Sequence, residues 1–217
     1  GKVYQVPAYE VLEGTRTSKG KAIFNFLSLS TTERVTSLLA VPKATKKESF
    51  YVVMVTKDGV IKKVEADSFG TVRKNGLIAM TLHGSDVLRW AKLTSGKDEM
   101  ILVSQKGQAI RFRESDIRPM GRTAAGVRSI RLGKGDEVVG MDVIESAKLK
   151  TQNSKLLVVM EHGYGKQTAL GQYKIQKRGG SGIKTAKVTP KTGAVVSAYI
   201  VGGEEDEMIA ISRKGQV

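Results

Sequence analysis

The clearest candidate for ligand chemistry in this sequence is the stretch 176–182, which reads Gln-Lys-Arg-Gly-Gly-Ser-Gly. Paired glycines let backbone N–H groups approach a phosphate closely, and Lys177 and Arg178 supply positive charge. The nucleotide-binding order Gly-x-x-x-x-Gly-Lys-Ser/Thr does not occur in this stretch. From residue types alone, a solvated flexible loop is the commoner explanation of such a stretch.

Basic residues recur at the corresponding place in other parts of the chain. For any one of these residues, a role in surface solvation is as good an explanation as ligand binding. Their recurrence at one position of a sequence repeat favours a shared ligand. The candidates for contacts to this ligand, besides Gln176 to Arg178, Gly179, Gly180 and Gly182, are Arg16, Lys19, Arg73, Lys74, Arg111, Arg113, Arg122, Arg128 and Lys184.

Catalytic and metal chemistry have little support in this sequence. His83 and His162 are the only histidines, they lie far apart, and cysteine is absent. The chain offers no Ser-His-Asp arrangement and no defensible acid and base pair. We therefore expect no catalytic residue, no metal site and no cofactor in this chain.

The composition narrows the class of partner. The 217 residues carry 36 Lys and Arg against 21 Asp and Glu, a net charge of +15. Without cysteine there is no disulfide scaffold, and we find no apolar run of the ~18 residues needed to cross a bilayer and no leader. With 40% hydrophobic residues the chain can bury a core. Nucleic acid, an anionic membrane surface or another acidic partner fits this charge.

The elements that position these residues repeat along the chain. Short apolar runs at 50–55, 100–103, 156–160 and 208–211 each lead to a tight turn with glycine. Counting Gly1 as the exit of one more turn, the turn glycines recur every 48 to 58 residues, and a second glycine follows 17 to 19 residues later. A third apolar run closes each unit, at 35–41, 87–93, 138–144 and 194–201. Such self-similarity indicates a repeat architecture.

The local pattern predicts strands. The runs are short, rich in Val and Ile, and end in pairs such as Asp-Gly that suit hairpin turns. Period-2 alternation predicts that Ile110 and Phe112 face a core while Arg111 and Arg113 face water; Val60 and Val64 flank Lys62 in the same way. We predict an all-β, propeller-like array of about four to five four-stranded blades in one domain, 1–217, with repeats at approximately 1–56, 57–104, 105–160 and 161–212 and another starting at 213–217.

The positive charge follows the repeat. The first parts of the repeats, 1–29, 57–82, 105–132 and 161–188, sum to +14, whereas the second parts sum to +1. In equivalent blades all first parts lie on the same side of the array, so the excess charge would form one continuous band. A curved polyanion fits such a band, and duplex DNA is the obvious example.

Residues 111–128, which read Arg-Phe-Arg-Glu-Ser-Asp-Ile-Arg-Pro-Met-Gly-Arg-Thr-Ala-Ala-Gly-Val-Arg, closely resemble the C-terminal DNA-wrapping domain of the A subunit of DNA gyrase. Residues 136–141, 161–166, Val3-Tyr4 and 20–23 carry the same resemblance, which covers essentially the whole chain. It implies a β-pinwheel, a propeller relative whose neighbouring blades exchange strands, and a DNA duplex wrapped on the outer rim.

The family's signature is a box of the form Gln-(Arg/Lys)-Arg-Gly-Gly-(Arg/Lys)-Gly, normally in the first blade. Residues 176–182 match it except at Ser181, and they lie in the fourth repeat counted from Gly1. We therefore expect a domain truncated at both ends, without most of its first and last blades.

The resemblance also implies where the domain works. It would be a non-catalytic part of a bacterial, cytoplasmic, nucleoid-associated type IIA topoisomerase, an isomerase that supercoils DNA. Its partners would be double-stranded DNA, the rest of gyrase A and the gyrase B protein, with no membrane. ATP and Mg²⁺ would bind elsewhere in the full enzyme.

Three alternatives remain beside this interpretation. The C-terminal DNA-bending domain of topoisomerase IV is the nearest, and the near-intact box favours gyrase over it. A protein-binding propeller of the WD40 type lacks support, because the Trp-Asp endings are missing and the charge is segregated. A propeller hydrolase would need an acid and base pair or a metal cluster.

Overall fold

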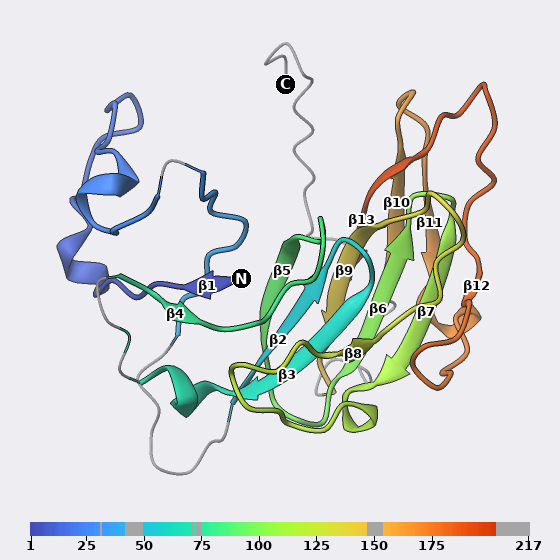
Figure 1. The fold of residues 1–217 in the computed structure, drawn as a ribbon. Coiled ribbons are helices and arrows are strands. Elements are labelled where there is room, and N and C mark those ends of the chain that lie inside the picture. The colour runs from blue at the N-terminus through green and yellow to red at the C-terminus, as the bar shows by residue number, and fades with distance from the viewer. Residues whose placement is uncertain (31, 42–49, 71, 73–74, 147–153, 203–217) are drawn as a thin grey trace.

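The computed structural model describes residues 1–30, 32–41, 50–70, 72, 75–146 and 154–202, and these residues form short strands joined by turns (Figure 1). The strands are β1 Lys2–Val3, β2 Tyr51–Thr56, β3 Val60–Glu65, β4 Leu77–Ile78, β5 Leu88–Thr94, β6 Glu99–Ser104, β7 Gln108–Arg113, β8 Val127–Arg128, β9 Val138–Ile144, β10 Lys155–Met160, β11 Gly165–Ala169, β12 Ile183–Lys184 and β13 Val195–Val201. Short 3-10 helices span Ala8–Glu10, Ile23–Asn25, Ala66–Phe69, Glu114–Asp116 and Leu170–Gln172.

The strands form four antiparallel sheets, three of which stand side by side in Figure 1. Their orders are β5-β2-β3-β8, β9-β6-β7-β12, β13-β10-β11 and β1-β4. This confirms the all-β, propeller-like prediction, and two of the sheets have the predicted four strands. Each predicted repeat starts at a hairpin turn, so the repeats 57–104 and 105–160 contribute strands to three sheets each.

Neighbouring sheets exchange strands, as in a pinwheel. β8 leaves its own repeat to pair with β3, with Ile61 opposite Val127. β12 pairs in the same way with β7 of the preceding sheet, with Ala109 opposite Ile183 (Figure 1). β4 pairs with β1. Each four-stranded sheet therefore ends in a two-residue strand that the following repeat supplies.

The hairpin turns predicted at Gly59, Gly107 and Gly163 are confirmed, whereas the run 208–211 and the turn at Gly215 lie outside the described residues. Gly59, Gly107 and Gly163 all have φ near +80°. The carbonyl of Gly59 accepts a hydrogen bond from the Ser129 amide at 2.8 Å, and Gly107 accepts from the Thr185 amide at the same distance. The Gly1 carbonyl accepts from the Ala79 amide at 3.0 Å, so Gly1 occupies the turn position that its sequence indicates.

The core lies between the sheets. Met100 and Leu102 of β6 pack in one buried cluster against β2 and β3, while Ile101 and Val103 pack in another against β10 and β13. A strand covered on both faces needs apolar residues at every position, which explains the continuous apolar runs. The third apolar runs at 87–93, 138–144 and 194–201 form β5, β9 and β13, whereas residues 35–41 form no strand.

The prediction that Arg111 faces water is wrong, and the one for Arg113 is confirmed. Arg111 is buried, and so are Lys62 and Lys63 of the equivalent strand β3. The next repeat covers the second face of each of these strands, so basic side chains that alternate with apolar ones also lie inside. No helix in the described part of the chain is long and apolar enough to span a membrane.

Candidate nucleic-acid interface

Two equivalent loops carry three of the predicted basic residues, Arg122, Lys177 and Arg178. They are the Arg122 loop, residues 120–126, and the box, residues 176–182. The amide of Met120 donates to the carbonyl of Lys63 in β3, and the amide of Gln176 donates to the carbonyl of Arg111 in β7, both at 2.8 Å. Each loop then leads directly into an exchanged strand, β8 or β12. Successive repeats therefore place the two loops at the same position of neighbouring sheets.

Each loop ends in a glycine that the fold requires. Gly126 has φ +98° and Gly182 has φ +71°. A Cβ atom on Gly126 would lie 2.7 Å from the carbonyl oxygen of Ile61, and one on Gly182 would lie 2.3 Å from that of Ala109. Only glycine allows the exchanged strand to approach the strand beside it so closely.

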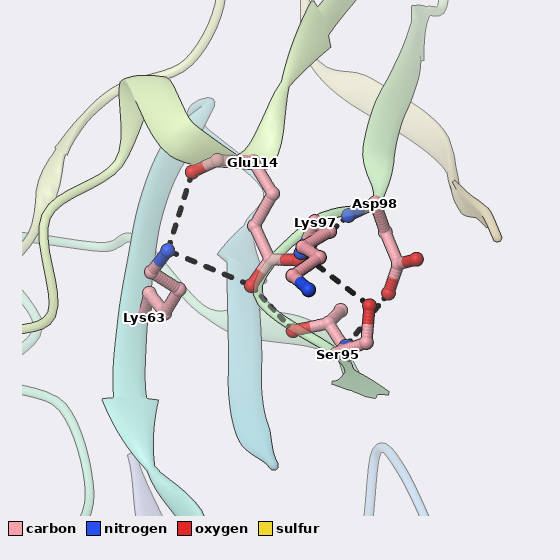
Figure 2. A network of polar contacts seen from close by, with 6 residues as sticks. Lys63, Ser95, Lys97, Asp98 and Glu114 are labelled. Carbon is pink, nitrogen blue, oxygen red and sulfur yellow. Dashed lines mark hydrogen bonds and ion pairs between the residues drawn. The ribbon is translucent and has the colours of Figure 1, made fainter. Parts of the chain in front are cut away.

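A buried polar network leads into the Arg122 loop (Figure 2). The Glu114 side chain is fully buried and forms an ion pair with Lys63, whose Nζ lies 3.6 Å from Oε1. The same carboxylate accepts hydrogen bonds from the Thr94 hydroxyl at 2.7 Å and from the Asp98 amide at 3.2 Å. These partners satisfy a charge that would otherwise be costly to bury, and they anchor the segment before the loop.

The Arg122 loop is held from the side of β3. Lys62 is fully buried, and its Nζ donates to the carbonyls of Ala79 at 2.7 Å, Ala124 at 2.9 Å and Arg122. Three N–H groups meet three acceptors, which matches the donor inventory of an ammonium group. Burial lowers the pKa of the Lys62 ammonium below its ordinary value. The carbonyl of Thr123 lies between those of Arg122 and Ala124 in the chain, and it accepts a hydrogen bond from the Thr81 hydroxyl at 2.7 Å.

The box is held by its own residues. Arg178 donates from Nε to the carbonyl of Asp116 at 2.9 Å and from an Nη atom to that of Arg128 at 3.1 Å. The Gly179 amide donates to the Ser129 carbonyl at 2.6 Å. Gly179 thus brings the box against the neighbouring repeat, and its N–H group is not directed to a ligand as the paired-glycine interpretation implied. Position 110, which corresponds to Lys62, is an isoleucine that packs near Gly180.

The remaining predicted site residues differ in exposure. Arg16, Lys19, Arg113, Arg128, Lys177 and Lys184 are exposed, whereas Gln176, Arg122, Arg178, Gly179, Gly180 and Gly182 are half-buried. Arg73 and Lys74 lie outside the described residues. The prediction that Arg111 contacts the ligand is wrong, because its guanidinium lies between two sheets, 2.6 Å from the Glu99 carboxylate and 2.8 Å from the Leu170 carbonyl.

A family model described as DNA gyrase C-terminal domain, β-propeller, matches residues 1–42, 51–95, 98–145 and 155–202. The chain belongs to this family. It is 42% identical over 209 residues to the DNA gyrase A subunit of Staphylococcus epidermidis and, equally, to that of Staphylococcus aureus. The alignment covers 96% of this chain and 23% of these relatives, so the chain spans about a quarter of their length.

Solved structures agree with the family. A structure of a DNA gyrase A C-terminal domain superposes with a TM-score of 0.77 at 28% identity, covering 93% of this chain and 62% of that one. The C-terminal domain of a DNA topoisomerase IV superposes with a TM-score of 0.74 at 25% identity, covering 86% and 55%. The predicted resemblance is therefore confirmed.

In this gyrase C-terminal domain, the two loops border a common hollow. It has a volume of about 520 Å³ and is lined by Asp116, Arg118, Met120, Val127 and Arg178. Arg118 was not among the predicted site residues. A signal for it exists in the sequence, because Arg118 precedes the Arg122 loop by two residues just as Lys174 precedes the box.

This surface is rich in basic residues. The segments 115–131 and 172–187 of the gyrase domain together contain nine Lys and Arg residues and a single acidic residue, Asp116. Within the residues that the structure describes, no group of three His, Cys, Asp or Glu side chains could hold a metal ion. Positive groups without acid, base or nucleophile partners suit binding to a polyanion.

Proposed function

We propose that this domain binds duplex DNA without sequence preference and bends it along the sheet edges that carry the Arg122 loop and the box. The observation that carries this proposal is the position of the two loops: successive repeats bring nine basic residues and one acidic residue to neighbouring sheet edges. Contacts to phosphate carry no sequence information, so affinity should be similar for unrelated sequences.

We infer the bend from the β-propeller description of the family, since the sheets of a propeller stand around an axis. A straight duplex meets only one basic loop of a curved array, whereas a bent duplex meets several. The additional ion pairs with phosphate compensate for the cost of smooth bending, which is about 1–6 kcal/mol for a site of 20–30 bp. The named relatives are gyrase subunits, so the bent segment would serve wrapping and negative supercoiling by a type IIA topoisomerase.

The remaining roles belong to the longer protein. We propose that this domain is non-catalytic and binds no cofactor. Strand passage, ATP and Mg²⁺ would then depend on the rest of gyrase A and on gyrase B. As part of a bacterial enzyme acting on the chromosome, the domain would work in the cytoplasm, at the nucleoid.

A fluorescence anisotropy titration with two short duplexes of unrelated sequence tests the proposal. If the surface neutralises roughly 6–10 phosphates, affinity should fall about 10³–10⁵-fold between ~50 and ~200 mM salt, equally for both duplexes. A salt slope near zero, or binding to only one duplex, contradicts the proposal.

The structural match to topoisomerase IV supports a second candidate, a C-terminal domain that bends DNA without stable wrapping. A topology assay with the full-length protein separates the two. Negative supercoiling that depends on residues 176–182 supports the gyrase role; relaxation and decatenation without it support topoisomerase IV.

A further inference from the structure

Three successive carbonyl groups of the Arg122 loop accept hydrogen bonds from side chains of the preceding repeat. The carbonyls of Arg122 and Ala124 accept from Lys62, and the Thr123 carbonyl between them accepts from the Thr81 hydroxyl. All peptide bonds in the described part of the chain are trans. In a trans peptide the C=O and N–H groups of one unit point in opposite directions. The N–H groups of Thr123 and Ala125 are therefore turned away from Lys62, and that of Ala124 is turned away from the Thr81 hydroxyl.

Two of these three outward N–H groups remain available. The Ala124 amide donates to the Gly121 carbonyl at 3.1 Å, which closes a turn. The amides of Thr123 and Ala125 make no hydrogen bond among the residues that the structure describes. Neighbouring outward N–H groups form a concave site for an anion. Thr123 is exposed, so an anion can reach this site from solvent.

A basic side chain stands at the start of the same stretch. Arg122 is half-buried, and its guanidinium has no protein partner within the described part of the chain. Arg118 and Arg128 are exposed on either side of the loop. An anion held by the two amides would thus lie in a basic environment. A phosphodiester group, which presents two charged oxygens in a row along DNA, matches two N–H donors and a guanidinium.

We propose that residues 122–125 form a binding site for one backbone phosphate of duplex DNA, and that Lys62 and Thr81 are the positioning residues that turn its amides outward. This site deepens the proposed function and rests on it. Lys62 has no exposed surface, so it acts on DNA only through the loop. The box lacks this arrangement, because its Gly179 amide points inward to Ser129.

Salt-dependent DNA binding of the 217-residue chain tests the two positioning residues. Lys62→Met and Thr81→Val should each weaken binding roughly tenfold, as expected for lost charge-assisted hydrogen bonds. Each should also lower the salt slope by about 1, the value for one lost phosphate contact. Thr81→Val changes no charge and alters an exposed residue, so it provides the readout even if Lys62→Met fails to fold. Combined with Arg122→Ala, neither substitution should lower the slope a second time.

Lys92→Met is the matched control, because Lys92 is a lysine of β5 in the same sheet whose Nζ pairs with Asp142 at 3.3 Å and which lies outside both loops. It should keep the wild-type salt slope. Amide NMR spectra with a short duplex provide a direct readout: the Thr123 and Ala125 signals should shift in the wild type and not in Thr81→Val.

The outcomes separate the two proposals. A wild-type salt slope near zero contradicts the proposed function itself. A steep wild-type slope that Thr81→Val leaves unchanged, with Thr123 and Ala125 signals that do not respond to the duplex, overturns the phosphate site and leaves the DNA-binding function standing.

Discussion

The Arg122 loop and the box occupy equivalent positions in successive repeats but are held by different means. The buried ammonium of Lys62 and the hydroxyl of Thr81, both from the preceding repeat, bind three carbonyls of the Arg122 loop. The box has an isoleucine at the position of Lys62, and it is joined to its neighbour by Arg178 and by the backbone of Gly179.

This difference shows that some basic side chains hold a loop in place, whereas others are free to bind a ligand. In the Arg122 loop the supporting side chain is buried, so Arg122 is left with no protein partner within the described residues. In the box, Arg178 supports the loop itself and has fewer donors left for a ligand. In this chain, the loop position of a basic residue therefore does not by itself predict whether its guanidinium is free to bind a ligand.

The largest expected effect concerns the residues beneath the loops. Arg111→Met should destabilise the domain by about 3–5 kcal/mol, because it leaves Glu99 buried without its partner. The salt slope of DNA binding should stay at the wild-type value. Urea unfolding and anisotropy titrations measure both quantities. A lower salt slope of DNA binding in folded Arg111→Met protein would show that Arg111 contacts DNA, and would contradict its assignment as a purely structural residue.

Gly182→Ala should cost at least ~2 kcal/mol of unfolding free energy. It combines a positive φ with a Cβ atom 2.3 Å from the Ala109 carbonyl oxygen. Gly20→Ala is the matched control, since Gly20 has φ +69° but nothing within 4 Å of its Cβ position. Thermal unfolding that gives equal losses for both variants would show that the close approach of β12 to β7 carries no energy.

The substitutions Arg178→Ala and Arg122→Ala should differ more in their effect on the unfolding free energy than in their effect on DNA binding. Removing Arg178 deletes two hydrogen bonds between repeats and should cost roughly 1–2 kcal/mol. Arg122→Ala should change the unfolding free energy by less than ~0.5 kcal/mol, yet lower the salt slope by about 1. Equal destabilisation by the two substitutions would contradict the assigned difference between the loops.

The smallest effect on stability is expected at the exposed lysines. Lys177→Ala and Lys184→Ala should each leave the unfolding free energy within ~0.5 kcal/mol of wild type. Each should lower the salt slope by about 0.9 and weaken binding to unrelated duplexes alike. Lys92→Ala serves as the control for a lost lysine charge, since Lys92 pairs with Asp142 at 3.3 Å and lies outside both loops. A slope change restricted to one DNA sequence would argue against phosphate contacts.

The sequence predicts much of this fold because glycine and apolar residues report local geometry. Positive φ at Gly59, Gly107 and Gly163 follows from their hairpin turns, and the apolar runs before them form β2, β6 and β10. The resemblance supplied the strand exchange, since two-residue strands such as β8 and β12 are too short to leave a periodic signal.

The alternation of apolar and basic residues in β3 and β7 led to a wrong prediction for the basic side chains that lie between the sheets. Ile110 and Phe112 are buried as expected, but Arg111 is buried as well, because its partners come from residues 99, 170 and 173. Lys62 likewise depends on carbonyls 17 to 62 residues away in the chain. An alternating pattern predicts that one face of a strand is buried, whereas a strand between two sheets is buried on both faces.

In our proposal, loops of successive repeats hold one DNA duplex and bend it. Energy transfer between dyes at the two ends of a duplex of ~40 bp, well below the DNA persistence length of ~150 bp, measures this directly. Saturating protein should raise the transfer efficiency, and the increase should shrink when Arg122→Ala is combined with Lys177→Ala and Lys184→Ala. Binding of the duplex with no change in its end-to-end distance would contradict the proposed bending.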